Sequence, residues 1–184
     1  MAVPGFQEMT LPILRACADG NEWSLAAARA EVSKHFALSE EDLSELLPSG
    51  TQPRFNNRLA WAKVYLERAG LLTKTRRGHF KISPAGEKVL QNPPPLIDVP
   101  FLSQFDSFED FRSKTTEKPE PTEVRPSALT EDETPEEQLQ AAHKRLCDDL
   151  ATELLSQIAE MSFEFFEKLV LDLMLAMGYG GSRE

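Results

Sequence analysis

The sequence predicts a mainly α-helical protein with one small β-hairpin. A helical pattern of apolar residues occupies residues 54–69. Two short strand-like runs, residues 71–75 and 79–82, follow it directly. Arg76-Arg77-Gly78 lies between these runs, as expected for a hairpin turn whose glycine adopts a left-handed conformation. A helix followed at once by a hairpin is the second half of a winged helix-turn-helix. We therefore predict that fold, followed by a linker and a C-terminal helical segment.

Two helices are expected before residue 39. The first falls within residues 4–19, and Pro12 inside this stretch either lies near its beginning or kinks it. Ser24 is a capping residue for the second helix, which opens with an alanine-rich run and ends near residues 36–38.

The helix at residues 54–69 should pack one face on a core. Its apolar residues at steps of three and four are Phe55, Leu59, Ala62, Leu66 and Ala69. Gly70 is expected to end this helix, because glycine takes the left-handed position after a helix without a Cβ clash.

Two further helices flank this helix and the hairpin. Ser39 and the three acids that follow it predict the cap and first turn of a short helix that ends at Leu47. After the hairpin, Ser83 is a capping residue and Pro84 suits the first helical position. The prolines that follow this helix predict the end of a first domain, residues 1–95.

Residues 96–134 are expected to be an acidic, proline-rich linker that is largely disordered. Four phenylalanines recur within it at helical spacing: Phe101, Phe105, Phe108 and Phe111. They either form a short helix that packs back on the first domain or serve as a docking peptide for another subunit.

Residues 135–184 predict two amphipathic helices. Thr134 is a capping residue before Pro135 and two glutamates, and Ser162 is a capping residue for the next helix. Two such helices bury too little apolar surface to form a core alone. We therefore expect a homodimer or a docked helical hairpin.

Positive charge is concentrated in one stretch of an acidic chain. The net charge of the whole chain is −10, but residues 54–88 carry nine basic and two acidic side chains. Local charge is sufficient for binding a polyanion, because phosphate contacts act over about 10 Å. This distribution predicts that one face attracts double-stranded DNA.

The candidate DNA-binding residues lie around the beginning of the 54–69 helix, along it and on the hairpin. Arginines there suit guanine or phosphate, amides suit adenine or the DNA backbone, and hairpin cations suit adjacent phosphates or the minor groove. The candidates are Gln52, Arg54, Asn56, Asn57, Arg58, Lys63, Lys74, Arg76, Arg77, His79 and Lys81. Trp61 and Tyr65 either stack on an extruded base or pack in the core, the commoner role of aromatics at helical spacing.

A second interpretation is a protein-interaction or oligomerisation module that uses the winged helix and the C-terminal helices. The acidic C-terminal region favours a protein partner over nucleic acid. Steep salt dependence of binding would distinguish a DNA partner from an apolar protein interface.

Composition limits the other functional classes. The sequence has no run of about 18 apolar residues and no charged-then-apolar leader, so we expect a cytoplasmic protein without a membrane partner. The two cysteines, Cys17 and Cys147, are far apart and have no neighbouring cysteine, which argues against a disulfide scaffold or a zinc site.

Several motifs together resemble the Mrr family of restriction endonucleases. The motifs similar to its N-terminal winged helix are Val3-Pro4, residues 57–62, Arg68-Ala69-Gly70-Leu71, Arg77-Gly78 and Ser83-Pro84-Ala85-Gly86. The stretch from Phe166-Glu167 to Gly178-Tyr179-Gly180-Gly181 resembles the opening helix of the family's nuclease domain. The resemblance covers residues 1–95 and 135–184.

The resemblance implies a DNA-binding winged helix joined to a PD-(D/E)xK nuclease fold that cleaves DNA, often modified DNA, with a divalent metal. The family's glycine-rich aspartate motif and Gln-x-Lys strand are absent from this sequence. We therefore expect a truncated family member without nuclease activity of its own.

Glu167 matches a position where related nucleases carry an acid that faces the metal, and it is the one catalytic candidate. Its alternative role is that of an exposed helical carboxylate. One carboxylate does not make a Mg²⁺ site, which needs converging acids. The resemblance therefore implies no cofactor in this chain and Mg²⁺ only in an intact family nuclease.

Overall fold

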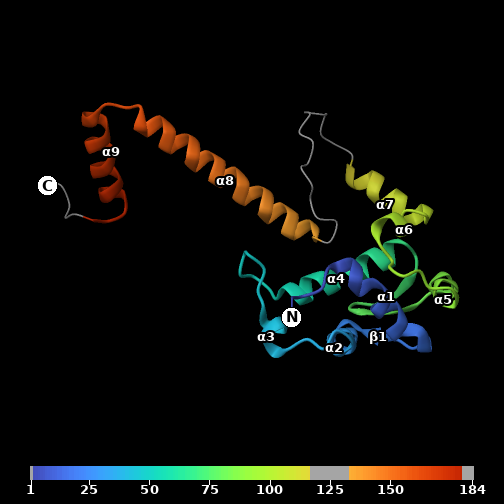
Figure 1. The fold of residues 1–184 in the computed structure, drawn as a ribbon. Coiled ribbons are helices and arrows are strands. Elements are labelled where there is room, and N and C mark those ends of the chain that lie inside the picture. The colour runs from blue at the N-terminus through green and yellow to red at the C-terminus, as the bar shows by residue number, and fades with distance from the viewer. Residues whose placement is uncertain (1, 117–132, 180–184) are drawn as a thin grey trace. The chain divides into compact units, whose positions relative to one another are not determined.

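The computed structural model describes residues 2–116 and 133–179, which fall into two compact units, Met1–Gln138 and Leu139–Glu184 (Figure 1). The elements of the first unit are α1 (Phe6–Ala16), the 3₁₀ turn η1 (Cys17–Asp19), β1 (Trp23–Ser24), α2 (Leu25–His35), α3 (Glu40–Ser44), α4 (Arg54–Arg68), β2 (Leu72–Arg76), β3 (His79–Ile82), α5 (Pro84–Gln91), α6 (Val99–Leu102) and α7 (Asp106–Thr116). The remaining helices are α8 (Pro135–Ala159) and α9 (Phe163–Ala176).

The predicted fold class, mainly α with a small β-hairpin and a C-terminal helical segment, is confirmed, and the first unit is winged-helix-like. Strands β2 and β3 form the hairpin, and Gly78 in its turn has the expected left-handed φ of +76°. The short strand β1 was not predicted; it pairs with β3 and gives an antiparallel sheet of order β1-β3-β2.

The core forms between α1 and α4, which lie against each other in Figure 1. The predicted apolar face of α4 is buried throughout, with Phe55 0% and Leu59 1% exposed. Gly70 has a φ of +75° after the helix, as predicted. Helix α1 begins at Phe6, so Pro12 lies inside it.

The predicted helix starts at Ser24, Ser39, Ser83 and Ser162 are confirmed, because each hydroxyl accepts a hydrogen bond from a backbone N–H three residues later. Ser83 also donates to the Gly70 carbonyl at 2.6 Å. Such caps act within one turn, which is why sequence alone locates them.

The phenylalanine-rich stretch packs on the first unit, the first of the two alternatives predicted for it. Ile97, Leu102 and Phe108 are each at most 1% exposed in the common core. The Thr10 hydroxyl donates to the Ile97 carbonyl at 2.8 Å, and Gln7 accepts from the Val99 N–H at 2.7 Å. The first unit thus continues past residue 95, where the sequence predicted a boundary. Residues 117–132 of the predicted linker lie outside the described residues.

The second unit contains most of α8 and all of α9. Of the residues in α9, all of which the structure describes, none is buried, and Phe163 is 75% exposed. The homodimer that these apolar faces suggest stays a prediction. Within the described ranges, no helix combines the length and apolar character that a bilayer span requires.

The two thiols are expected to differ sharply in reactivity. Cys17 is fully buried, and burial, with a smaller effect of the Asp19 carboxylate, raises the pKa of its thiol to about 12. Cys147 is exposed. Because the thiolate is the reactive form, maleimide should label only Cys147 in the folded protein and both thiols after unfolding, as mass spectrometry would show. Rapid labelling of Cys17 in the folded protein would contradict its burial.

Candidate nucleic-acid interface

The candidate residues at the beginning of α4 are held by other protein groups. Arg58 donates to the carbonyls of Val3 at 2.7 Å and Pro4 at 3.1 Å, and pairs with Glu137 at 3.0 Å. Only 14% of its side chain is exposed. Arg54 pairs with Glu45, and its Nε lies 3.5 Å from Glu137 Oε1. Both arginines therefore already have anionic partners.

The amides beside these arginines are also bound. Asn57 is 3% exposed; its Oδ1 accepts from the Thr134 hydroxyl at 2.8 Å, and its Nδ2 donates to Glu136. Gln52 donates to the same Glu136 carboxylate at 3.0 Å. Thr134, Glu136 and Glu137, which we call the acidic clasp, thus cover four of the five candidates in this group, all but Asn56.

The acidic clasp is built by the cap of α8. The Thr134 N–H donates to Glu137 at 2.9 Å, and the Glu137 N–H donates to the Thr134 hydroxyl at 3.3 Å. This reciprocal pair confirms the predicted helix start. The cap was predictable from the sequence but its docking on α4 was not, because capping is local and the docking contacts join residues up to 84 positions apart.

Asn56 faces a different environment. It lines a surface hollow of about 370 Å³ between α2 and α4. The lining residues are Leu25, Ala26, Arg29, Gln52, Asn56, Leu59 and Ala60. A lining that combines apolar side chains with amide and guanidinium groups suits a planar polar ligand or a sugar–phosphate segment. Arg29, which no sequence pattern singled out, joins the candidates because it lines this hollow.

Lys63 lies farther along α4, and its side chain is mostly buried in contacts with other protein groups. It pairs with Glu67 at 2.6 Å, its side chain is 15% exposed, and its ammonium lies 5.7 Å from the centre of the Phe80 ring. Its position inside these contacts leaves little of the charge available to a ligand.

The hairpin presents the most accessible positive charge. Lys74, Arg77 and Lys81 are exposed and form no ion pair with any residue in the described ranges. Arg76, in contrast, pairs with Glu22 at 2.8 Å. Glu22 also accepts from Thr75 at 2.6 Å, and these contacts, the Thr75 hydrogen bond first, lower the pKa of its carboxyl group.

The remaining hairpin candidate, His79, is partly buried. Its Nδ1 lies 3.2 Å from the Arg77 carbonyl oxygen. This contact links the imidazole to the hairpin turn that carries Arg77. His79 also lies near the exposed cations.

The catalytic candidate Glu167 lies in the second unit. It is exposed on α9 and lines a hollow with Phe163, Phe166, Val170 and Leu171. Among residues 2–116 and 133–179, no group of three or more His, Cys, Asp or Glu side chains is placed to hold a metal ion. The neighbours of Glu167 in this hollow are apolar, which does not suit Mg²⁺.

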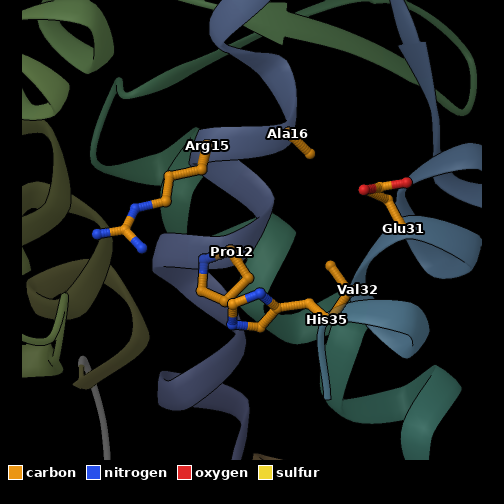
Figure 2. Close-up of a pocket in the computed structure, with 6 residues that line it drawn as sticks. All are labelled: Pro12, Arg15, Ala16, Glu31, Val32 and His35. Carbon is orange, nitrogen blue, oxygen red and sulfur yellow. The ribbon is translucent and has the colours of Figure 1, made fainter. Parts of the chain in front are cut away.

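A smaller hollow of about 190 Å³ lies between α1 and α2. Its polar side chains are Arg15, Glu31 and His35. Figure 2 shows the Arg15 guanidinium pointing away from the side of the hollow where His35 and Glu31 lie. Because these groups do not converge, we assign this hollow no ligand.

Comparison with known proteins places the chain in a family. Residues 6–92 match the family described as the Mrr N-terminal domain. This match contains helices α1 to α5 and all the DNA-binding candidates. The whole chain is 30% identical to the type IV methyl-directed restriction enzyme EcoKMrr of Escherichia coli (strain K12), and it spans 62% of the length of that relative. No solved structure matches the chain. The family resemblance seen in the sequence is thus confirmed: the chain belongs to the Mrr family.

Proposed function

We propose that the first unit is the DNA-binding part of a cytoplasmic restriction-system protein and binds duplex DNA, plain or methylated. The observation that carries this proposal is the set of exposed hairpin cations Lys74, Arg77 and Lys81, none of which forms an ion pair with a residue that the structure describes. They lie within the stretch that matches the Mrr N-terminal domain. Phosphate contacts of this kind supply most of the affinity of non-specific DNA binding.

The hollow between α2 and α4 supports a second set of contacts. Arg29 of α2, Asn56 of α4 and Gln52, in the loop before α4, line it. Amides and guanidinium groups are the side chains that read base edges and bind the DNA backbone. In this proposal the hairpin provides affinity, and the beginning of α4 provides position and sequence preference.

We propose no complete nuclease site in this chain. Glu167 is the one residue that the family resemblance links to catalysis, and its neighbours in the hollow on α9 are apolar. Related nucleases use Mg²⁺ held by several converging acids. DNA cleavage is therefore expected to need groups beyond Glu167.

The exposed apolar faces of the second unit favour a second candidate function, oligomerisation through α8 and α9. Leu146 and Leu150 of α8 are 70% and 56% exposed, and Phe163 of α9 is 75% exposed. Faces of this kind usually bind protein. Self-association that is insensitive to salt would support this function and is compatible with DNA binding by the first unit.

The hairpin variant Arg77→Ala/Lys81→Ala is expected to weaken DNA binding about tenfold at moderate salt, for all sequences alike. Each lost phosphate contact should also reduce the slope of log affinity against log salt by about 0.9. Fluorescence anisotropy of labelled plain and methylated duplexes, titrated at several salt concentrations, measures both quantities.

Lys144→Ala/Arg145→Ala is the matched control, because it removes the same charge from exposed positions on α8. It should leave both the affinity and the slope nearly unchanged. No binding by the wild-type chain at low salt would overturn the proposed function. Equal loss in the two double variants would show that overall charge, and not the hairpin, determines binding.

A further inference from the structure

The acidic clasp presents to α4 the same chemistry as a DNA backbone. Its carboxylates accept from the guanidinium of Arg58 and from the side-chain amides of Gln52 and Asn57. Carboxylate and phosphate bind arginine through the same planar fork of N–H donors. A donor that is engaged by the acidic clasp is therefore unavailable to a phosphate or a base edge.

The contacts of the acidic clasp are selective within the candidate interface. They cover Gln52, Arg54, Asn57 and Arg58 at the beginning of α4. The hairpin cations lie outside it. None of the three clasp residues belongs to the apolar core. The contacts that hold the clasp on α4 are hydrogen bonds and ion pairs, which water can replace when the clasp opens.

We propose that the acidic clasp is an intramolecular competitor of DNA, which must leave the beginning of α4 before the four candidates that it covers can contact DNA. This inference rests on the proposed DNA-binding function. With the clasp closed, DNA meets mainly the hairpin cations, which hold phosphates without regard to sequence. With the clasp open, Arg58 and the two amides add contacts that can distinguish bases.

The closed clasp must offset the cost of taking its polar groups out of water. Glu137 is 8% exposed and Thr134 is fully buried, so both lose contact with water when the clasp closes. A buried carboxylate needs a charged partner, and Arg58 supplies it. The apparent DNA association constant of such a protein is the average of the constants of the open and closed states, weighted by their populations, and the open state binds more tightly. Weakening the clasp should therefore strengthen DNA binding.

The test compares three full-length proteins by fluorescence anisotropy with the same labelled duplex: wild type, Glu136→Gln/Glu137→Gln and Glu40→Gln/Glu41→Gln. The clasp variant should bind about tenfold more tightly than wild type because its open fraction is larger. Its salt dependence should also be steeper, since more cations reach phosphates. The control variant removes the same charge from exposed positions at the beginning of α3 and should change affinity less than about twofold.

Thr134→Ala tests the inference without changing the net charge. It removes the hydroxyl that binds Asn57 and caps α8. DNA binding should strengthen about threefold. Reciprocal linkage requires that DNA binding open the clasp, so amide hydrogens of residues 134–138 should exchange faster in the complex.

The outcomes separate this inference from the function on which it rests. Equal DNA affinity of the wild type, the clasp variant and Thr134→Ala would overturn the inference and leave DNA binding in place. Equal strengthening by the clasp variant and the α3 control would also overturn it, by showing general electrostatic repulsion. No DNA binding by any of these proteins would overturn both.

Discussion

Replacing Phe108 with alanine should lower the free energy of unfolding of the first unit by about 3–5 kcal/mol. Phe108 is fully buried, and the centre of its ring lies 5.4 Å from that of Tyr65. Tyr65 in turn packs edge-on against Phe6 at 5.1 Å. Removal of the Phe108 ring leaves a cavity between α7 and α4 and exposes this aromatic cluster. Urea unfolding followed by circular dichroism measures the loss.

Phe105→Ala is the matched control, because it removes the same atoms from a position one turn earlier that is only partly buried. Its ring contacts Phe101, with 5.9 Å between the ring centres. We expect a loss of about 1 kcal/mol, since less apolar area leaves water on folding. Equally small losses for both variants would show that α7 does not stabilise the first unit and would favour the docking-peptide alternative.

The position of α7 illustrates what the sequence could not predict. Proline and charge around this stretch are typical of a linker, and the four phenylalanines fitted either a packed helix or a docking peptide. Distant partners decide between these alternatives. Phe108 of α7 packs on Tyr65 of α4, and the carbonyl of Ile97, ahead of α6, accepts from the Thr10 hydroxyl 87 positions away. No local pattern encodes a contact at that separation. Strand β1 was missed because its two residues are too few for a period.

Elements fixed by nearby residues were predicted well. The serine caps and Gly70 depend on bonds or dihedral angles within a few residues, and the buried face of α4 follows from helical spacing. The candidate interface shows the same contrast between local features, which the sequence predicts, and long-range contacts, which it does not. The sequence identified residue types suited to DNA, but whether each side chain is already bound by another protein group depends on residues far away in the sequence. Arg58 is bound by Glu137, 79 positions away, whereas Arg77 has no such partner in the described ranges.

Gly86→Ala should be as damaging as the loss of Phe108, although it adds only one methyl group. A Cβ at this position would lie 2.3 Å from the Leu71 carbonyl oxygen and 2.9 Å from Ile82 Cγ1. The backbone oxygen cannot move freely, because it accepts from the Ser83 N–H at 3.0 Å where the hairpin returns to α5. Alanine is favoured over glycine in a helix by about 1 kcal/mol. Overpacking against backbone outweighs this preference, and we expect a net loss of about 3 kcal/mol or more.

Gly50→Ala is the appropriate comparison. At Gly86 an added methyl group is crowded, whereas at Gly50 it has free space but the backbone is left-handed. Gly50 has a φ of +68° and nothing within 4 Å of the added Cβ, so the change strains the backbone without a clash. A left-handed alanine costs about 1–2 kcal/mol. Urea unfolding should therefore rank Gly86→Ala as clearly the less stable variant. A neutral or stabilised Gly86→Ala would mean that α5 does not pack on the beginning of β2. The hairpin would then lose the anchor that holds its cations beside α4, and the proposed arrangement of the DNA-binding surface would be overturned with it.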